Sequence, residues 1–168
     1  VGSGLDAGVD VGPMIDAKAL ASALAFIDDA VAGGARVLAG GKRQGASGNF
    51  LQPTLLVDVP ANAKCLREEI FAPVAVVLPF DTEDEALAIA NDTEYGLAAY
   101  FYARDLGRVW RVAEALEFGI VGINEGIIST EVAPFGGMKE SGIGREGSKY
   151  GIEDFLEVKY LAMGGIGA

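Results

Sequence analysis

The sequence predicts an α/β fold in which parallel strands alternate with crossover helices. Apolar residues recur at helical spacing over residues 16–32, and two later segments carry helix-start signals. Short apolar stretches flank those segments and give the order strand, helix, strand, helix, strand. This order is typical of parallel pairing with right-handed crossovers. Half of the 168 residues are hydrophobic, which favours a folded domain.

The first helix is expected over residues 16–32, because apolar side chains follow one another at spacings of three and four. Pro13 lies just ahead of it, and the glycine pair at 33–34 is a suitable C-terminal stop. A short strand is then predicted over 36–39, followed by a turn-rich excursion at 40–48.

The second half supplies the remaining elements. Residues 74–80 are nearly all apolar and predict a strand covered on both faces. Thr82, with a glutamate three residues later, forms a capping-box pattern that starts a second helix. An aromatic-rich strand is expected over 97–103, and Asp105 caps a third helix. A short apolar strand at 119–124 completes the series.

The C-terminal segment has a different pattern. Leu156, Val158 and Tyr160 alternate with charged residues, which predicts a half-exposed strand. A terminal strand with one polar face is often an edge that pairs with another sheet or with another subunit. The segment 151–168 is therefore expected to differ in role from residues 1–150.

Composition excludes several function classes. The formal net charge of −11 repels phosphate backbones, so nucleic acid is not an expected partner. There is no histidine and one cysteine, which excludes a histidine-based triad, an internal disulfide and a cysteine-clustered metal site, so no metal is expected. No apolar run is long enough for a membrane span, and no signal peptide is visible. The single cysteine fits a reducing, cytoplasmic setting. A first residue of valine suggests part of a longer chain.

Residues 134–147 form a glycine-rich loop that demands tight turns or close backbone approach. Residues 142–147 match the G-x-G-x-x-G pattern of dinucleotide-binding loops. That pattern requires a preceding strand, a following helix and an acid about 20 residues later. Because this context is missing, we interpret the loop as something other than a Rossmann turn.

Three further positions have a functional and a structural interpretation. The pair Glu68-Glu69 is either a solvated turn or a carboxylate site for a ribose diol, with Phe71 offering a flat apolar face. Cys65 is either a reactive thiol, activated by the nearby charges of Lys64 and Arg67, or an incidental one, and the lack of a histidine partner favours the incidental thiol. Ser129 either caps a turn or donates to an anionic ligand.

Taken together, three segments resemble one family: residues 68–74, residues 90–97 and residues 134–146, in this order. They are similar to the C-terminal third of NAD(P)-dependent aldehyde dehydrogenases, and the similarity runs essentially from end to end. The resemblance implies that residues 1–150 are the C-terminal part of that catalytic domain and that residues 151–168 are an oligomerisation strand. Residues 124–129 and 146–160 are most similar to succinate-semialdehyde dehydrogenases.

The resemblance also implies roles for five residues. Glu69 would bind the nicotinamide ribose hydroxyls, and Phe71 would pack beside the nicotinamide. Phe135 would line the aldehyde tunnel, and Glu146 matches an acid that relays a proton near the site of thioester hydrolysis. Ser129 would hold the distal carboxylate of the substrate, a role that suits a hydroxyl better than an aromatic ring.

The family reaction proceeds through a cysteine thioester, with hydride transfer to NAD or NADP and hydrolysis by a glutamate-activated water. Cys65 does not match the catalytic motif, so the nucleophile and the dinucleotide-binding domain are expected outside this chain. We therefore expect the chain alone to be inactive. Ala72 stands where the family usually has glycine.

Other interpretations remain open at this point. The aldehyde is expected to be succinic semialdehyde, oxidised to succinate, with another polar aldehyde as the alternative. A non-catalytic anion-binding or assembly module is a more distant alternative. The expected partners are a small carboxylated aldehyde and further copies of the chain, which would form a homo-oligomer.

Overall fold

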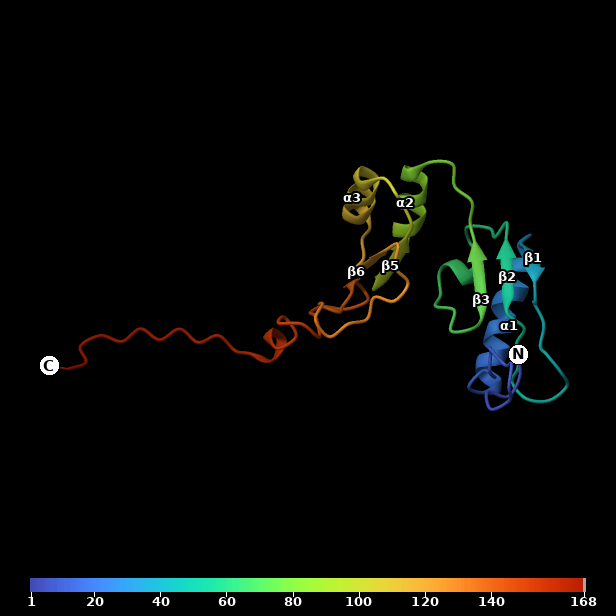
Figure 1. The fold of residues 1–168 in the computed structure, drawn as a ribbon, viewed down its shortest axis with the longest axis horizontal. Coiled ribbons are helices and arrows are strands. Elements are labelled where there is room, and N and C mark those ends of the chain that lie inside the picture. Colours follow the sequence, from blue (N-terminus) through green and yellow to red (C-terminus); the bar gives the residue numbers. More distant parts are fainter. Residues whose placement is uncertain (168) are drawn as a thin grey trace. The chain divides into compact units, whose positions relative to one another are not determined.

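The computed structural model describes residues 1–167 and divides at Pro79 into two compact units (Figure 1). The first unit runs from Val1 to Pro79, and the second begins at Phe80. Each unit has its own strands and at least one helix, so each is described by itself.

The first unit is organised around helix α1, Ala17–Ala32, which confirms the predicted helix. Asp16 is its N-cap, and its Oδ1 atom accepts a hydrogen bond of 2.7 Å from the Ala19 N–H. At the other end Gly34 has a φ of +108°, a left-handed conformation that suits glycine. The side chains that α1 buries are Leu20, Ala23, Phe26, Ile27 and Ala30.

A three-stranded sheet packs against this helix. It consists of β1 (Arg36–Ala39), β2 (Thr54–Val57) and β3 (Val74–Val77). β1 pairs antiparallel with β2, and β2 pairs parallel with β3. Leu56 of β2 is fully buried in the core shared with α1. β1 was expected from the sequence, whereas β2 was not.

The strand predicted over residues 74–80 is shorter than expected. The prediction that both of its faces are buried is wrong for this unit. β3 ends at Val77, and its residues alternate between half-buried and exposed. Val74 and Val76 pack against the core, while 49% of Val77 is exposed. Only one face of β3 meets the α1 core, which explains the alternation.

In the second unit β5 (Ala98–Phe101) and β6 (Ile120–Ile123) pair in parallel across helix α3 (Leu106–Ala115). This confirms the predicted strand–helix–strand crossover. Asp105 caps α3 by accepting from the Arg108 N–H at 2.7 Å, as expected. β3 belongs to the sheet of the first unit, and β5 pairs with β6 alone, so the strand order does not continue through one series of parallel pairs in the described residues.

Helix α2 (Glu83–Asn91) precedes β5. Thr82 Oγ1 accepts from the Glu85 N–H at 3.2 Å, and the Glu85 carboxylate accepts from the Asp81 N–H at 2.8 Å. This reciprocal arrangement is close to the predicted capping box. A two-residue strand, β4 (Tyr95–Gly96), follows and pairs antiparallel with β7 (Met138–Lys139).

Two short 3₁₀ helices complete the described structure, η1 (Lys64–Leu66) and η2 (Glu153–Phe155). Residues 156–167 form no strand, and their side chains are exposed, so the expected strand is absent within this chain. Within residues 1–167 the alternating pattern has no partner strand, so the segment lacks the inter-strand hydrogen bonds that define a strand. Residue 168 lies outside the described residues. Within residues 1–167, none of the helices is both long and apolar enough to cross a bilayer.

Candidate functional site

The glycine-rich loop of residues 134–147 is closed at its base. Phe135 and Glu146 exchange two backbone hydrogen bonds, each 2.8 Å long. Arg145 adds a second closure, because its Nη1 atom donates to the carbonyls of Gly137 at 2.8 Å and Gly144 at 2.7 Å. The two arms of the loop are therefore held together by backbone and guanidinium hydrogen bonds, and Phe135 and Glu146 lie side by side.

Close backbone approach explains why the loop needs glycine. A Cβ atom on Gly136 would lie 2.6 Å from the Gly144 carbonyl oxygen. A Cβ on Gly119, just before β6, would lie 1.9 Å from the Gly136 oxygen. Gly142 and Gly144 have φ angles of +122° and +89°, which other residues rarely adopt. The expectation of tight turns and close approach is confirmed.

The loop is not the start of a dinucleotide-binding helix. The two-residue strand β7 precedes the G-x-G-x-x-G segment, and the next regular element after Gly147 is the short η2. Ile143, inside the pattern, is fully exposed. This agrees with our interpretation that the sequence match has the wrong context.

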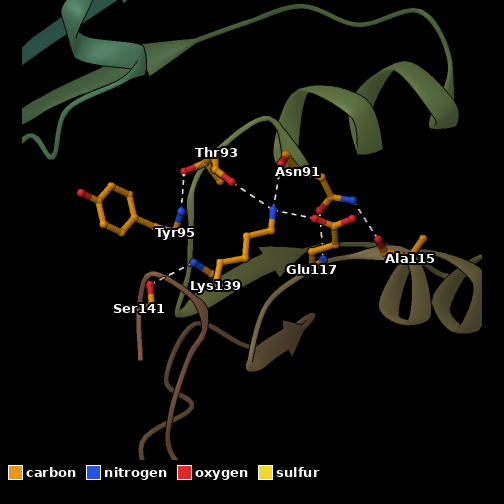
Figure 2. Close-up of polar contacts among 8 residues, drawn as sticks. Asn91, Thr93, Tyr95, Ala115, Glu117, Lys139 and Ser141 are labelled. Carbon is orange, nitrogen blue, oxygen red and sulfur yellow. Dashed lines mark hydrogen bonds and ion pairs between the residues drawn. The ribbon is translucent and has the colours of Figure 1, made fainter. Parts of the chain in front are cut away.

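A polar cluster connects the tip of the loop to the ends of two helices (Figure 2). Lys139 Nζ donates to the carbonyls of Asn91 and Thr93, each at 3.0 Å, and pairs with Glu117 Oε2 at 2.6 Å. The Asn91 side chain in turn donates to the Ala115 carbonyl at 2.8 Å and accepts from the Glu117 N–H at 3.0 Å. The sequence reasoning missed this cluster.

The segment that carries Ser129 begins at a fixed turn. Asn124 has a φ of +56°, and its side chain accepts from the Ala103 N–H at 2.9 Å and donates to the Ala103 carbonyl at 2.7 Å. The Glu125 carboxylate accepts from the next two N–H groups. Ser129 itself is exposed. Asn124 was missed as an anchor, although asparagine after a strand is a known turn signal.

Residues beyond Ser129 run beside the end of the glycine-rich loop. The Ser148 N–H donates to the Glu131 carbonyl at 2.8 Å. Ser129, Phe135 and Glu146 therefore belong to one group of adjoining loops in the second unit. Phe135 is half-buried, and Glu146 is exposed.

Glu69 and Phe71 lie in the first unit, between η1 and β3. Glu69 is exposed, and 84% of Phe71 is exposed. Such an aromatic ring on the surface is available to stack on a planar ligand. Ala72, the residue that departs from the family pattern, is half-buried against the core of this unit. The roles expected of Glu69 and Phe71 remain predictions.

The geometry around Cys65 agrees with its interpretation as an incidental thiol. Cys65 is unpaired and buried within η1. Burial raises the pKa of its thiol, and the nearby Asp29 carboxylate acts in the same direction. Since the thiolate is the nucleophilic form, this cysteine is poorly suited to covalent catalysis. Within residues 1–167, histidine, cysteine, aspartate and glutamate form no group of three that could hold a metal ion.

Comparison with known proteins places these features in a family. The sequence model described as "Aldehyde dehydrogenase family" matches residues 1–161. An NADP(+) succinate-semialdehyde dehydrogenase of Escherichia coli is 65% identical over 98% of the chain. A glutarate-semialdehyde dehydrogenase of Pseudomonas aeruginosa is 62% identical over 99% of it, and a 3-sulfolactaldehyde dehydrogenase of Pseudomonas putida is 53% identical over 99%.

The chain spans about a third of the length of these relatives, 34% of each. Among solved structures, that of an E. coli NADP-dependent enzyme matches 97% of the chain and 34% of its own, with a TM-score of 0.93 at 65% identity. An NAD+ complex of an aldehyde dehydrogenase from Bacillus cereus matches 94% of the chain and 32% of its own, with a TM-score of 0.89 at 40% identity. The chain has an α/β fold and belongs to the aldehyde dehydrogenase family.

Proposed function

We propose that the protein containing this chain oxidises a short aldehyde with an acidic tail, succinic semialdehyde first, to the corresponding acid. One observation carries the proposal: the three relatives named above are dehydrogenases of succinate semialdehyde, glutarate semialdehyde and 3-sulfolactaldehyde. Each of these aldehydes has an anionic group at the end away from the carbonyl. The shared chemistry is therefore an aldehyde presented with a fixed negative charge.

Within that enzyme, we assign this chain to the C-terminal third. The three segments 68–74, 90–97 and 134–146 follow the order expected for that part of the family's catalytic domain. Residues 1–150 would contribute part of the catalytic domain, and residues 151–168 an oligomerisation strand. The nucleophilic cysteine of a thioester mechanism would lie outside these residues, because Cys65 is buried and the raised pKa of its thiol disfavours the thiolate.

Three residues of the second unit would bind the aldehyde or take part in its conversion. Ser129 is exposed, so its hydroxyl is free to donate to a carboxylate. Phe135 would line the approach to the carbonyl, and Glu146, bonded to it through the backbone, would relay a proton. A hydrogen bond to a charged group is worth about 1.5–3 kcal/mol, enough to select an acidic aldehyde over a neutral one.

Two residues of the first unit would bind the cofactor, NAD or NADP. The residues present fit that group: the exposed Glu69 carboxylate offers two acceptors for ribose hydroxyls, and the exposed Phe71 ring offers an apolar face for a planar ring. When bound, the dinucleotide supplies a hydride acceptor. NADP is named for the E. coli relative and NAD for the B. cereus complex, so both are tested.

Steady-state kinetics of the whole enzyme tests the substrate. The enzyme should prefer succinic or glutaric semialdehyde over propanal in kcat/KM by at least about tenfold, the value of one charged hydrogen bond. Ser129→Ala should reduce that preference and leave the kcat/KM for propanal unchanged, while Ser129→Thr, which keeps the hydroxyl, should retain it. Equal kcat/KM for acidic and neutral aldehydes would overturn the proposal.

The same assay separates a second candidate, an aldehyde with a sulfonate tail. The 53% identity to the 3-sulfolactaldehyde dehydrogenase is the observation in its favour. A higher kcat/KM for 3-sulfolactaldehyde than for both semialdehydes would select this candidate. A polypeptide of residues 1–168 alone should oxidise none of these aldehydes, and turnover by it would contradict the assignment of the nucleophile to another segment.

The C-terminal segment is proposed to pair with another copy of the chain in a homo-oligomer. Val158 is 99% exposed and Tyr160 is 87% exposed. Leu156→Asp should lower the mass of the whole enzyme in light scattering, whereas Lys159→Ala, on the alternate face, should not. An unchanged mass in Leu156→Asp would remove this role. We also propose a cytoplasmic location, where a free thiol such as Cys65 stays reduced.

A further inference from the structure

We propose that Lys139 is a positioning residue, which fixes the glycine-rich loop to the ends of α2 and α3 and thereby places Phe135 and Glu146. This inference rests on the proposed function for the roles of those two residues. The contacts of Lys139 are independent of that function, and Figure 2 shows them as one connected cluster.

The ammonium group of Lys139 has a complete set of acceptors. A lysine ammonium has three N–H donors. Here Nζ lies 3.0 Å from the Asn91 carbonyl, 3.0 Å from the Thr93 carbonyl and 2.6 Å from Glu117 Oε2. The side chain is 25% exposed, so the stem is largely covered while the charge is paired. This is the geometry of a defined anchor rather than of a solvated surface lysine.

The acceptors lie at the C-terminal ends of two helices. Asn91 is the last residue of α2, and Glu117 comes two residues after α3 ends at Ala115. A cation is favoured at this end of a helix, where carbonyl groups lack intrahelical partners. The Asn91 side chain joins the two ends by bonding to the Ala115 carbonyl and the Glu117 N–H. Lys139 therefore contacts two helix ends that the Asn91 side chain already holds together.

The backbone at Lys139 is held in an unfavourable conformation. Its φ is +53°, in the left-handed region that a residue with a Cβ rarely adopts. Such a conformation persists where surrounding contacts determine it. Those contacts are the β4–β7 pairing opposite Tyr95, the Glu140 N–H bond to the Glu94 carbonyl at 2.9 Å, and the Ser141 Oγ bond from the Gly96 N–H at 2.9 Å.

Lys139 at the tip of the glycine-rich loop influences the position of Phe135 and Glu146 at its base, because hydrogen bonds connect the two arms of the loop. The Arg145 guanidinium donates to the Gly137 carbonyl. The backbone N–H of Phe135 donates to the carbonyl of Glu146, and the N–H of Glu146 donates to the carbonyl of Phe135. A shift of the tip is therefore transmitted to Phe135 and Glu146 instead of being absorbed within the loop. A shift of about 1 Å in the position of a catalytic group can lower the reaction rate by as much as about a hundredfold.

The test compares variants of the whole enzyme. Lys139→Met removes the charge and keeps the stem, Lys139→Gly relieves the positive φ without restoring the anchor, and Lys139→Arg keeps a cation. Lys149→Met is the matched control, because Lys149 is an exposed lysine near the same loop whose Nζ lies 4.9 Å from the centroid of the Tyr150 ring. Kinetic constants are expressed per active site, titrated by the burst of product.

The expected result is selective. Lys139→Met and Lys139→Gly should lower kcat/KM for the aldehyde by about tenfold or more per active site, with KM for the dinucleotide unchanged. Lys139→Arg should recover part of the loss, and Lys149→Met should show none. A lower melting temperature with unchanged kinetic constants per active site would overturn the inference, because it would show a purely structural role. Full activity of Lys139→Gly would overturn it as well.

Hydrogen exchange keeps this inference separate from the proposed function. In Lys139→Met the amides of Phe135 and Glu146 should exchange faster, while those of α1 in the first unit should be unchanged. If the wild-type enzyme oxidised no acidic aldehyde, the proposed function would fail, and faster exchange at these two amides would still support the anchor. Unchanged exchange at both amides would overturn it.

Discussion

Phe135 and Glu146 exchange two backbone hydrogen bonds of 2.8 Å, which close the base of the glycine-rich loop. The closure brings the Gly136 carbonyl against the Cα of Gly119, at the start of the segment that forms β6. The position of the loop thus depends on a close backbone contact between two glycines, Gly119 and Gly136. This contact leads to the first prediction.

Gly119→Ala should displace the glycine-rich loop. Its Cβ would lie 1.9 Å from the Gly136 carbonyl oxygen, and the obstacle is backbone rather than a flexible side chain. We expect a loss of stability of about 1–3 kcal/mol, the usual cost of overpacking, and, if the proposed function holds, a lower kcat/KM for the aldehyde. Urea unfolding and steady-state kinetics of the whole enzyme measure the two effects.

Gly107→Ala is the control for Gly119→Ala. Gly107 lies in the first turn of α3, and a Cβ there would make ordinary contacts of 3.4 Å with Arg111 Nη1 and Asp105 Oδ1. Alanine is the better helix former, so stability should stay constant or rise by up to about 1 kcal/mol. Equal behaviour of the two variants would show that the Gly119 contact does not place the loop.

The N-cap of α2 gives the second prediction. Thr82→Ala removes the oxygen that accepts from the Glu85 N–H, and should cost about 1 kcal/mol of stability. Thr82→Ser keeps that oxygen and should be nearly neutral. Far-UV circular dichroism during urea unfolding measures both. An unchanged midpoint in Thr82→Ala would mean that the Glu85 bond to the Asp81 N–H suffices to start the helix.

Local signals in the sequence were sufficient for much of the fold. The N-caps Thr82 and Asp105 and the apolar periodicity of residues 16–32 predicted the three α-helices of the described residues, because caps and apolar faces are encoded by residues close together in the sequence. The short strands β2, β4 and β7 were missed. β4 and β7 have only two residues each, which is too short for a periodic pattern, and the missed strands are completed by pairing partners elsewhere in the chain.

In the candidate site, too, features set by neighbouring residues were predicted and features that depend on distant residues were not. The glycine-rich loop and its need for close backbone approach were predicted, since glycine density is visible locally. The Lys139 anchor was not, because its amine bonds to a carbonyl 48 positions earlier. The C-terminal alternation was read as a strand, yet residues 156–167 form none in this chain. A strand is completed by its neighbour, and a sequence pattern does not say which chain provides it.

Cys65 gives the third prediction, which concerns its reactivity. The thiol is buried, and its pKa is raised mainly by that burial. Near neutral pH the folded protein should therefore react with iodoacetamide far more slowly than the same protein in urea. Mass spectrometry after timed quenching measures the modified fraction at Cys65. Equal rates in the folded and unfolded protein would show that the thiol is accessible.

The last prediction concerns pH and the ion pairs between α2 and α3. Glu83 accepts from Arg111 Nε at 3.1 Å and from Arg108 Nε at 2.9 Å. The hydrogen bond from Arg111, with smaller contributions from Arg108, lowers the pKa of Glu83 below its ordinary value of 4.5. A carboxyl whose pKa is lower in the folded state adds stability that is complete above the unfolded pKa and is lost as pH falls through the folded pKa.

Glu83→Gln should therefore be less stable than the wild-type protein at about pH 7, and the difference should shrink as the pH falls below 4.5 and disappear once it has fallen through the lowered pKa of Glu83. The effect should be small and should shrink with added salt, since the two guanidinium groups are more than half exposed. Asp84→Asn is the control, because Asp84 is an exposed acid in the same turn of α2. Urea midpoints across this pH range measure both variants. A stability difference that persists unchanged in acid would show that Glu83 acts through packing or hydrogen bonding that does not require its charge.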